Sequence, residues 1–362
     1  MNVQQKELIT LEFGPAMDGL CVQETFYPWD ITVRRFMNEG LKVNPYGEDP
    51  DQKKGLRETF LGNSWAEGVM RYEKELGFDP VLRLGIYLPF LWGIRETLCR
   101  NHIENENDFN KLINYSRTVE AKYFTDSDFR EVYSPYREGH EKGDYSVRVN
   151  IMGFFFASRE LFGVENHLYA FYDKPELLHR MNEYLLEFYA AYLTKLLAIL
   201  PADVLYLSED LSGKNGPMIS PAFCEEFLCR YYKRFFPLLR NMGVKYVFVD
   251  TDGDFTDLIP LFISAGVDGF LPMDVQAGMD IVQVRRDFPK LRFIGGYNKL
   301  ALVKGKCAID EEFARILPVA KQGGYIIGCD HQPPPETPFE NYRYYIKKLT
   351  DLSKSARRIQ QI

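Results

Sequence analysis

The chain has 362 residues, of which 46% are hydrophobic and 26% are charged, and its formal net charge at pH 7 is −7. This balance is typical of a globular protein with a sizeable core and argues against disorder. The negative charge comes without a stripe of Lys and Arg, so nucleic acid is not expected as a partner.

Cysteine spacing and hydropathy indicate the compartment. The six cysteines lie at positions 21, 99, 224, 229, 307 and 329 and form no CxxC pair, so we expect reduced thiols in a cytoplasmic protein. The N-terminus lacks a charged segment followed by an apolar one, and no run of about 18 apolar residues occurs. Neither export nor membrane insertion is expected.

The first 75 residues are the least regular part of the chain. Residues 24–47 mix aromatic residues, an Arg pair and Pro and Gly breaks, which predicts an arm or lid with one short helix. Arg34 could reach an acidic group of a substrate, although a surface ion pair is the commoner role for such an arginine. Residues 64–76 are predicted to be helical.

From residue 79 onward, short apolar or β-branched runs alternate with segments of helical periodicity. The runs lie at residues 81–88, 146–156, 204–207, 244–249, 269–271, 291–294 and 325–327. The longest helical segment covers residues 177–200 and ends at Pro201, and another covers residues 221–241 with Ser220 as its predicted N-cap. This alternation predicts parallel strands joined by right-handed crossovers.

Seven such strands and one from the N-terminal arm would close a (β/α)8 barrel, the α/β fold known as a TIM barrel. Residues 101–145 would then be an insertion between the second and third strands. We expect a single domain, with an arm over residues 1–75, the barrel over residues 76–352 and a tail over residues 353–362. An open doubly wound sheet is the alternative, but no GxGxxG fingerprint follows a predicted strand.

Several predicted strands end in polar residues, which a barrel would bring to one mouth. In chain order these residues are Glu209 and Asp210, then Asp250, Asp252 and Asp254, then Asp274, then Tyr297 and Asn298, and finally Asp330 and His331. Crowded carboxylates need a bound cation or raised pKa values, so acids that converge with one histidine predict a metal site or an acid/base cluster. Lys214, in the loop after Asp210, is a further candidate for contacting a substrate.

Several of these residues also have a structural interpretation. Asp254 suits a helix N-cap, and Asp274 suits an ordinary turn. His331 precedes three prolines, where a solvated histidine is also common. Glu209 and Asp210 are harder to explain structurally, because two adjacent acids before a Gly-Lys-Asn-Gly loop gain nothing from burial alone.

The chain resembles the uroporphyrinogen decarboxylase superfamily of (β/α)8 barrels over roughly residues 60–350. The resemblance rests on EDLSGKNGPMISPAFCEEF, VDTDGDFTDLIPLFISAGVDGFLPMDVQAGMD and GGYIIGCDHQPPPETPFENY. The superfamily also holds zinc methyltransferases that pass methyl groups between corrinoid proteins and coenzyme M, demethylating methyltransferases that serve corrinoid proteins, and the barrel of cobalamin-independent methionine synthase.

True decarboxylases of this superfamily carry a PxWxMRQAGR-type segment near the N-terminus and an Asp at the end of the second strand. This chain instead reads FYPWDITVRRFMNEG in the arm and VLRLGIYLP at the second strand. His331 does match the histidine of the decarboxylases in the final strand loop. The resemblance therefore implies decarboxylation, which needs no cofactor, only as an alternative.

The zinc methyltransferases place His-x-Cys after the fifth strand, often an acid after the next strand, and a Cys after the last. This chain has Asp250 and Asp252 at the first two positions, Asp274 near the acid, and Asp330 or His331 near the final Cys. Zinc still accepts such ligands, but they suit polarising the leaving heteroatom of a methylated substrate better than activating a thiol.

The resemblance thus implies a cytoplasmic methyltransferase that moves a methyl group between a small methylated substrate and a corrinoid carried by a partner protein. The expected metal or acid/base centre, with zinc as the candidate metal, is Asp250, Asp252, Asp274 and His331. Catalysis and substrate orientation are assigned to His331, Glu209 and Asp210, and substrate binding to Tyr297, Asn298, Lys214 and Arg34. The alternatives are a decarboxylase for a carboxylated tetrapyrrole or smaller acid and a non-catalytic small-molecule-binding barrel, and a homodimer is left open.

Overall fold

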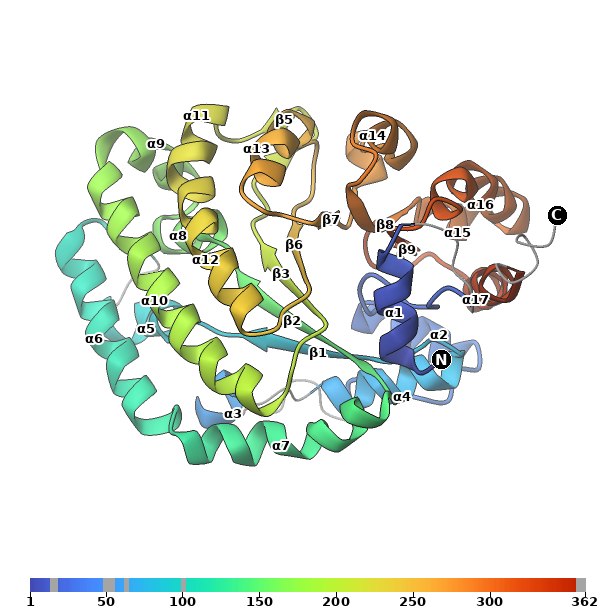
Figure 1. Ribbon diagram of the computed structural model, residues 1–362, viewed down its shortest axis with the longest axis horizontal. Helices are drawn as coiled ribbons and strands as arrows, with labels where there is room; N and C mark the ends of the chain where they lie inside the picture. Colours follow the sequence, from blue (N-terminus) through green and yellow to red (C-terminus); the bar gives the residue numbers. More distant parts are fainter. Residues whose placement is uncertain (14–18, 48–55, 62–64, 99–101, 356–362) are drawn as a thin grey trace.

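The computed structural model describes residues 1–13, 19–47, 56–61, 65–98 and 102–355, and its centre is a curved β-sheet (Figure 1). Seven strands lie side by side in chain order, and every neighbouring pair is parallel. They are β1 (Val81–Ile86), β2 (Ser146–Met152), β3 (Val204–Ser208), β6 (Tyr246–Asp250), β7 (Gly269–Leu271), β8 (Arg292–Tyr297) and β9 (Tyr325–Cys329). Each overlaps one of the predicted apolar runs, so the seven predicted strands are confirmed.

Helices between the strands cover the outer face of the sheet, as parallel pairing requires. Between β2 and β3 lie α8 (Phe154–Phe162), α9 (Val164–Asp173) and α10 (Pro175–Ile199). The last of these confirms the long helix predicted at residues 177–200. The later strands are followed by η2 (Thr256–Leu258), α13 (Ile259–Ser264), η3 (Val275–Ala277), α14 (Ile281–Asp287), α15 (Leu300–Lys304), α16 (Lys306–Ala320) and α17 (Phe339–Ser355).

The helical segment predicted at residues 221–241 consists of three parts. They are α11 (Pro221–Cys224), a turn of π-helix named η1 (Glu225–Cys229) and α12 (Arg230–Asn241). The predicted N-cap is confirmed, because the Ser220 hydroxyl accepts the Phe223 N–H at 3.2 Å. The π-helical turn was not predicted, because it leaves the apolar spacing of the sequence unchanged.

Two further segments extend beyond the regular strand–helix alternation. A short antiparallel hairpin, β4 (Ser212–Gly213) and β5 (Gly216–Pro217), follows β3. Between β1 and β2 the chain forms α5 (Pro89–Leu98), α6 (Glu106–Tyr123) and α7 (Asp126–Lys142). The last two helices occupy the insertion predicted at residues 101–145.

The N-terminal arm is more helical than the sequence predicts. It contains α1 (Val3–Leu11), α2 (Asp30–Asn38), α3 (Leu56–Phe60) and α4 (Ala66–Leu76), where one short helix and a helix over residues 64–76 were expected. α1 covers the amino-terminal end of the sheet, where Leu11 packs with the inward-facing Phe248 and Ile326. Helix α1 of the arm is therefore packed against the barrel interior.

An eighth strand that closes the barrel is not formed by the described residues, so this part of the prediction is wrong. An extended, buried segment at residues 21–25 instead lies between β9 and β1. The Cys329 N–H of β9 donates to the Glu24 carboxylate at 2.6 Å, and the Arg83 guanidinium of β1 donates to the Glu24 carbonyl at 3.0 Å. Hydrogen bonds that involve side chains thus replace the backbone ladder of an eighth strand. The sheet itself remains a half-barrel.

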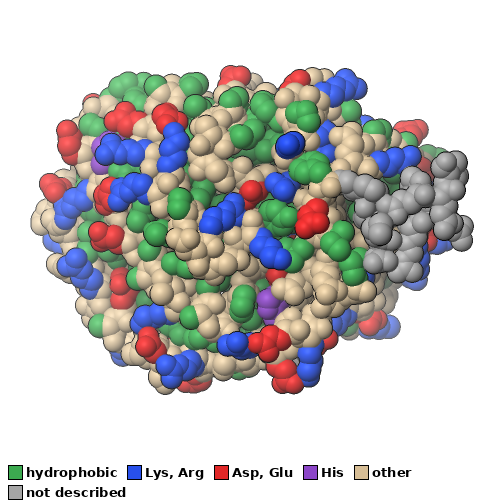
Figure 2. Space-filling model, in the orientation of Figure 1, with side chains coloured by type: hydrophobic (Ala, Val, Ile, Leu, Met, Phe, Trp, Pro, Cys, Tyr) green, Lys and Arg blue, Asp and Glu red, His purple; other side chains and the backbone are tan. Residues whose placement is uncertain are grey.

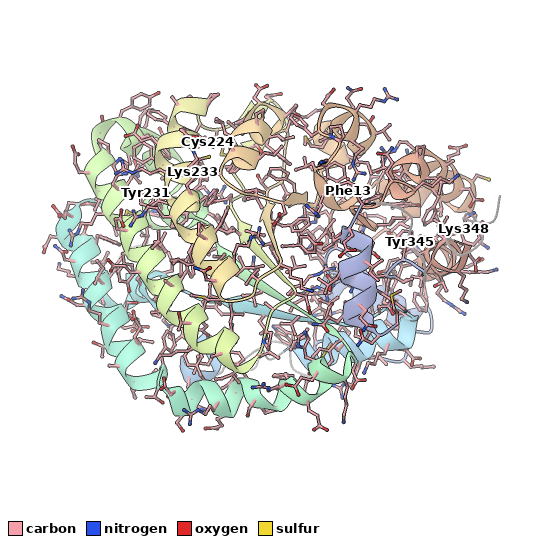
Figure 3. The ribbon with its side chains drawn as sticks, in the orientation of Figure 1. Phe13, Cys224, Tyr231, Lys233, Tyr345 and Lys348 are labelled. Atoms are coloured by element: carbon pink, nitrogen blue, oxygen red, sulfur yellow. The ribbon has the colours of Figure 1, made fainter. Side chains whose placement is uncertain are left out.

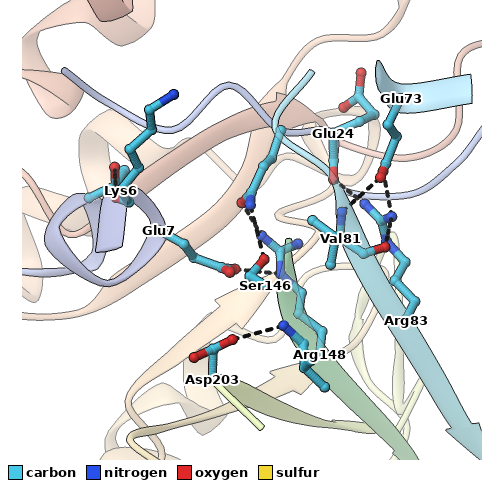
Figure 4. A network of polar contacts seen from close by, with 12 residues as sticks. Lys6, Glu7, Glu24, Glu73, Val81, Arg83, Ser146, Arg148 and Asp203 are labelled. Carbon is cyan, nitrogen blue, oxygen red and sulfur yellow. Dashed lines mark hydrogen bonds and ion pairs between the residues drawn. The ribbon is translucent and has the colours of Figure 1, made fainter. Parts of the chain in front are cut away.

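Buried ion pairs tie this segment and α1 to the amino-terminal half of the barrel (Figure 4). Arg148 of β2 donates to Glu7 of α1 and to Gln23, both at 2.6 Å. Arg83 pairs with Glu73 of α4 at 2.5 Å. Because each of these buried arginines is paired with a glutamate, the barrel interior can accommodate charged side chains at this end.

The outside of the molecule carries both kinds of charge. Figure 2 shows Lys and Arg interspersed with Asp and Glu over the visible face, with no basic stripe. No described helix is long and apolar enough to cross a membrane. The five cysteines in the described part of the chain are all free thiols.

Candidate active site

Strand alternation decides which predicted site residues face the barrel interior. On β3, Tyr206 belongs to the inner core, and the Ser208 hydroxyl donates to the inward-facing Asp250 of β6 at 2.9 Å. The carboxylate of Asp210, two residues further, lies near Asp250 and Asp252. Glu209, between Ser208 and Asp210, therefore points to the helix layer outside.

The inward residues gather at the carboxyl end of the sheet, where the sequence places them. The His331 Nε2 atom lies 3.8 Å from the nearer Asp252 carboxylate oxygen. The rings of Phe26 and Trp29, from the arm, lie 5.7 and 5.8 Å from the His331 ring. We call Asp210, Asp250, Asp252, Asp274, Asp330 and His331 the acid cluster.

Burial and mutual repulsion shift the pKa values within the acid cluster. Burial, opposed by the Ser208 hydrogen bond and reinforced by Asp252 and Asp210, raises the pKa of Asp250 to about 8. Burial raises the pKa of Asp252 to about 6, with Asp210 and Asp274 adding to it. Burial and the nearby Lys299 lower the pKa of His331. At neutral pH the acid cluster thus holds a protonated Asp250 and a neutral His331 imidazole.

Lys299 is a site residue that the sequence analysis missed. Its peptide N–H donates to Asp330 at 3.0 Å, and its ammonium group lies 4.0 Å from the same carboxylate. Burial raises the pKa of Asp330 to about 6, and Lys299 opposes that rise. The signal was its position directly after Tyr297 and Asn298, at the end of a predicted strand.

Asp210 has a cationic partner of its own. Arg159 of α8 donates to the Asp210 carboxylate at 2.7 Å and to its carbonyl at 2.6 Å. Asp210 also has a φ of +47°, a backbone conformation that is uncommon outside Gly, Asn and Asp. The residue is thus held in a specific geometry at the rim of the acid cluster.

Glu209 is brought to the start of α8 instead of the mouth. Its carboxylate accepts the N–H groups of Phe154, Phe155 and Phe156 at 3.0, 2.8 and 3.2 Å, and the hydroxyl of Tyr232. Burial raises its pKa to about 7, against the effect of these hydrogen bonds. A carboxylate at a helix N-terminus satisfies orphan peptide donors, so its position has a structural explanation.

The four predicted substrate-binding residues are not brought together. Tyr297 faces outward and packs on Phe313 and Tyr345, the latter labelled in Figure 3. Asn298 lies at the rim, where its side chain bonds Gln276 at 2.9 Å. Lys214 is exposed in the β4–β5 hairpin, and Arg34 forms an exposed ion pair with Asp30 at 2.9 Å.

Two adjoining cavities open on the side of the barrel formed by β1 to β3 and the arm, and the sequence analysis did not locate them. The outer chamber has a volume of about 780 Å³ and lies between β1, β2, α3 and α5. The inner chamber, of about 170 Å³, lies deeper between the arm and β1 to β3. Gly85, Tyr87 and Asn150 line both chambers. The Asn150 amide donates to Ser208 at 2.8 Å, which links the chambers to Asp250.

The predicted zinc site does not fit these side chains. Over the described ranges, no group of three or more His, Cys, Asp or Glu residues is arranged to hold a metal ion. Both carboxylate oxygens of Asp330 accept peptide N–H groups, from Lys299 and from Val275 at 3.1 Å. The arrangement suits acid/base chemistry.

The sequence of the barrel also matches a known family. The family model described as uroporphyrinogen decarboxylase (URO-D) matches residues 143–352, more than half of the chain. The chain belongs to the URO-D family. This URO-D match begins just before β2, so the arm and β1, which lack the decarboxylase motifs, lie outside it. No curated protein matches the chain.

Solved structures resemble this URO-D family member to different degrees. A methyltransferase from Methanosarcina mazei is 14% identical with a TM-score of 0.61, over 97% of this chain and 99% of that one. A putative vitamin-B12 independent methionine synthase from Listeria monocytogenes is 10% identical with a TM-score of 0.43, over 94% and 98% of the two chains. At such identities, the likeness concerns the fold alone.

Proposed function

We propose that this URO-D family member is a methyltransferase that moves a methyl group between a methylated substrate and a corrinoid carried by a partner protein. One observation carries the proposal: the Asp250 carboxyl group, whose pKa is raised to about 8, is linked through Ser208 and Asn150 to a cavity of substrate size. A general acid works best when its pKa lies near the working pH. The shared fold with a methyltransferase along nearly the whole chain supports the same assignment.

The residues of the mouth would supply the proton that demethylation needs. When the methyl group leaves a heteroatom for the corrinoid nucleophile, the heteroatom gains an electron pair and must be protonated. Asp250 would donate that proton, and the demethylated product would leave as a neutral molecule. Ser208, which already donates to Asp250, would stabilise the carboxylate that remains. Asn150 donates to Ser208 and so directs the hydroxyl hydrogen toward Asp250.

Decarboxylation of a carboxylated tetrapyrrole is the alternative within the family. Such a substrate carries many negative charges and needs cations at the mouth. The acid cluster holds five aspartates, and the nearby Lys299 and Arg159 are engaged by Asp330 and Asp210. Since these charges would repel the substrate, the electrostatics favour methyl transfer. A non-catalytic binding barrel gives no reason for a protonated Asp250 among the acid cluster.

The proposal is tested by following methyl transfer in a reconstituted system. We expect the purified protein to methylate a reduced corrinoid protein from the same genome, detected by the absorbance of the corrinoid, when a methyl ether such as anisole is supplied. Asp250→Asn should lower the rate about 100-fold or more, as for loss of a general acid. Asp257→Asn, at an exposed position of η2, is the matched control.

A parallel assay covers the alternative reaction. The protein is incubated anaerobically with uroporphyrinogen, and the products are separated by chromatography. We expect no coproporphyrinogen. Its formation, together with an unchanged corrinoid spectrum in the first assay, would reverse the assignment.

A further inference from the structure

The two chambers together have the shape of one elongated binding site. They meet where Gly85 and Asn150 line both. A Cβ atom built on Gly85 would make only an ordinary van der Waals contact, with the Tyr87 ring at 3.8 Å, so there is free space at the junction for a small group. A ligand could therefore extend from the outer chamber past Gly85 into the inner one.

The outer chamber suits an uncharged, apolar body. Its walls include Phe60, Trp92, Ile86 and Met152, and the Phe60 and Trp92 rings meet edge to face at 6.1 Å. Trp92 is 49% exposed, so its ring is accessible to a ligand in the chamber. The described lining residues include the carboxylates of Glu96 and Glu160 and the imidazole of His102, and the two carboxylates disfavour an anionic ligand.

The inner chamber suits a small polar end group. Phe26 and Tyr206 line it, Phe26 packs on His331, and burial, reinforced by the nearby Asp250, raises the pKa of the Tyr206 hydroxyl. Gln332 also lines the chamber, and its buried side-chain oxygen has no hydrogen-bond partner among the described residues. Such an oxygen would accept a hydrogen bond from a ligand or a bound water. The inner chamber thus adjoins the acid cluster.

Arg83 is the cation of the inner chamber, but it is already neutralised. Its guanidinium pairs with Glu73 at 2.5 Å and donates to the Glu24 carbonyl at 3.0 Å. A carboxylate ligand would have to compete with Glu73, which is almost completely buried. The chamber therefore offers a ligand aromatic surface and hydrogen-bonding groups rather than a free charge.

We propose that the substrate is an uncharged compound with an aromatic body that binds in the outer chamber against Trp92 and Phe60. Its methylated heteroatom passes Gly85 and Asn150 and reaches the inner chamber beside the acid cluster. This inference rests on the proposed function and names its substrate class. A volume of about 780 Å³ lies in the range of cavities that enclose drug-sized ligands, so the smallest methyl donors would leave most of the chamber empty.

Intrinsic fluorescence provides a binding assay that needs no corrinoid protein. The chain has three tryptophans, and all lie at the site: Trp29 beside His331, Trp65 in the inner chamber and Trp92 in the outer chamber. Anisole, 4-methoxybenzoate and methanol are titrated separately into the full-length protein. We expect anisole to quench the fluorescence saturably, with an affinity at least about tenfold above that of 4-methoxybenzoate, and methanol to have no saturable effect.

Substitutions at the junction and in the outer chamber test the geometry. Gly85→Leu should close the passage and weaken anisole binding about tenfold or more, whereas Gly85→Ala adds one methyl group to open space and should bind normally. Trp92→Ala should weaken binding to a similar extent, and Trp92→Phe should restore most of it. Thermal unfolding of each variant, with a midpoint equal to that of the wild type, shows that the loss is not misfolding.

The outcomes distinguish the proposed substrate class from the proposed methyltransferase function. Equal or tighter binding of 4-methoxybenzoate, or wild-type affinity in Gly85→Leu and Trp92→Ala, would overturn the substrate class. Methyl transfer from methanol without anisole binding would also overturn it and would leave the methyltransferase assignment intact. Anisole binding with the expected variant pattern supports the substrate class even if no corrinoid protein is methylated, in which case the proposed function alone fails.

Discussion

Glu209 and Asp210 are adjacent in the chain, yet they face opposite sides of the sheet. The Glu209 carboxylate accepts three peptide N–H groups at the start of α8 and the Tyr232 hydroxyl. Gly153, next to it, leaves the room that the carboxylate fills, since a Cβ atom there would lie 2.1 Å from the Glu209 carboxyl carbon. Glu209 therefore joins β3, α8 and α12 in the structural layer behind the mouth.

Replacing Glu209 tests that structural role. Glu209→Ala leaves buried donors of α8 and Tyr232 without an acceptor, so we expect the free energy of unfolding to fall by about 3 kcal/mol. Chemical denaturation followed by circular dichroism measures the change. Glu187→Ala, on the exposed face of α10, should alter stability by less than about 0.5 kcal/mol. An unchanged stability in Glu209→Ala, with activity lost, would instead return Glu209 to the catalytic set.

The raised pKa of Asp250 predicts a distinctive effect of pH on stability. The folded protein holds the Asp250 proton up to about pH 8, whereas an unfolded chain releases it near pH 4, so the folded state binds the proton more tightly between these values. The associated stability is present at low pH and is lost as the pH rises toward 8. Asn does not titrate, so the Asp250→Asn variant does not lose this stability. Its free energy of unfolding, relative to that of the wild type, should therefore increase as the pH rises from 5 to 8.5.

Thermal unfolding midpoints at a series of pH values measure this difference. Asp257→Asn, an exposed substitution of the same kind, serves as the control. A difference between Asp250→Asn and the wild type that stays constant or shrinks with rising pH would contradict a protonated Asp250. Such a result would also remove the general acid from the proposed mechanism.

At the scale of the elements, the sequence predicted the strands and helices whose formation depends on local residue patterns. All seven strands, the helix α10 and the Ser220 cap follow from periodicity and capping chemistry, because each depends on residues close in sequence. The strand ends also marked Asp250, Asp252 and His331 correctly as neighbours. Parallel strands bring their carboxyl ends together whatever the details of the helices.

The alternation of side chains within a strand was the information that the sequence analysis did not use. Glu209 and Tyr297 were assigned to the mouth together with their neighbours, although consecutive residues of a strand point to opposite faces. The metal site was predicted from residue types, whereas binding a metal ion depends on distances that no local pattern encodes. Lys299 follows a predicted strand end and was overlooked, whereas the two chambers arise from contacts between segments distant in sequence and became visible only in the fold.

At the scale of the whole molecule, the N-terminal arm completes the barrel that the sheet leaves open. The sequence predicted that the arm would supply the eighth position, but it could not predict that side chains would replace a strand ladder there. Glu24 makes the central contacts: its carboxylate accepts the Cys329 N–H of β9 and the Tyr342 hydroxyl of α17. Its carbonyl accepts Arg83 of β1. The two edges of the sheet are thus joined through one residue.

Glu24→Ala and Glu24→Gln form a matched pair that tests this closure. Burial raises the pKa of Glu24 to about 7, so its carboxyl group is already partly neutral at pH 7 and an amide resembles it closely. We expect Glu24→Gln to cost less than about 1 kcal/mol and Glu24→Ala to cost about 2 to 3 kcal/mol, because the buried Cys329 N–H then has no acceptor. Hydrogen exchange should rise first at Cys329 and at Asp79, whose N–H donates to the Val22 carbonyl at 2.7 Å. Equal stability of the two variants, with no change in exchange at these amides, would show that the arm does not hold the sheet edges together.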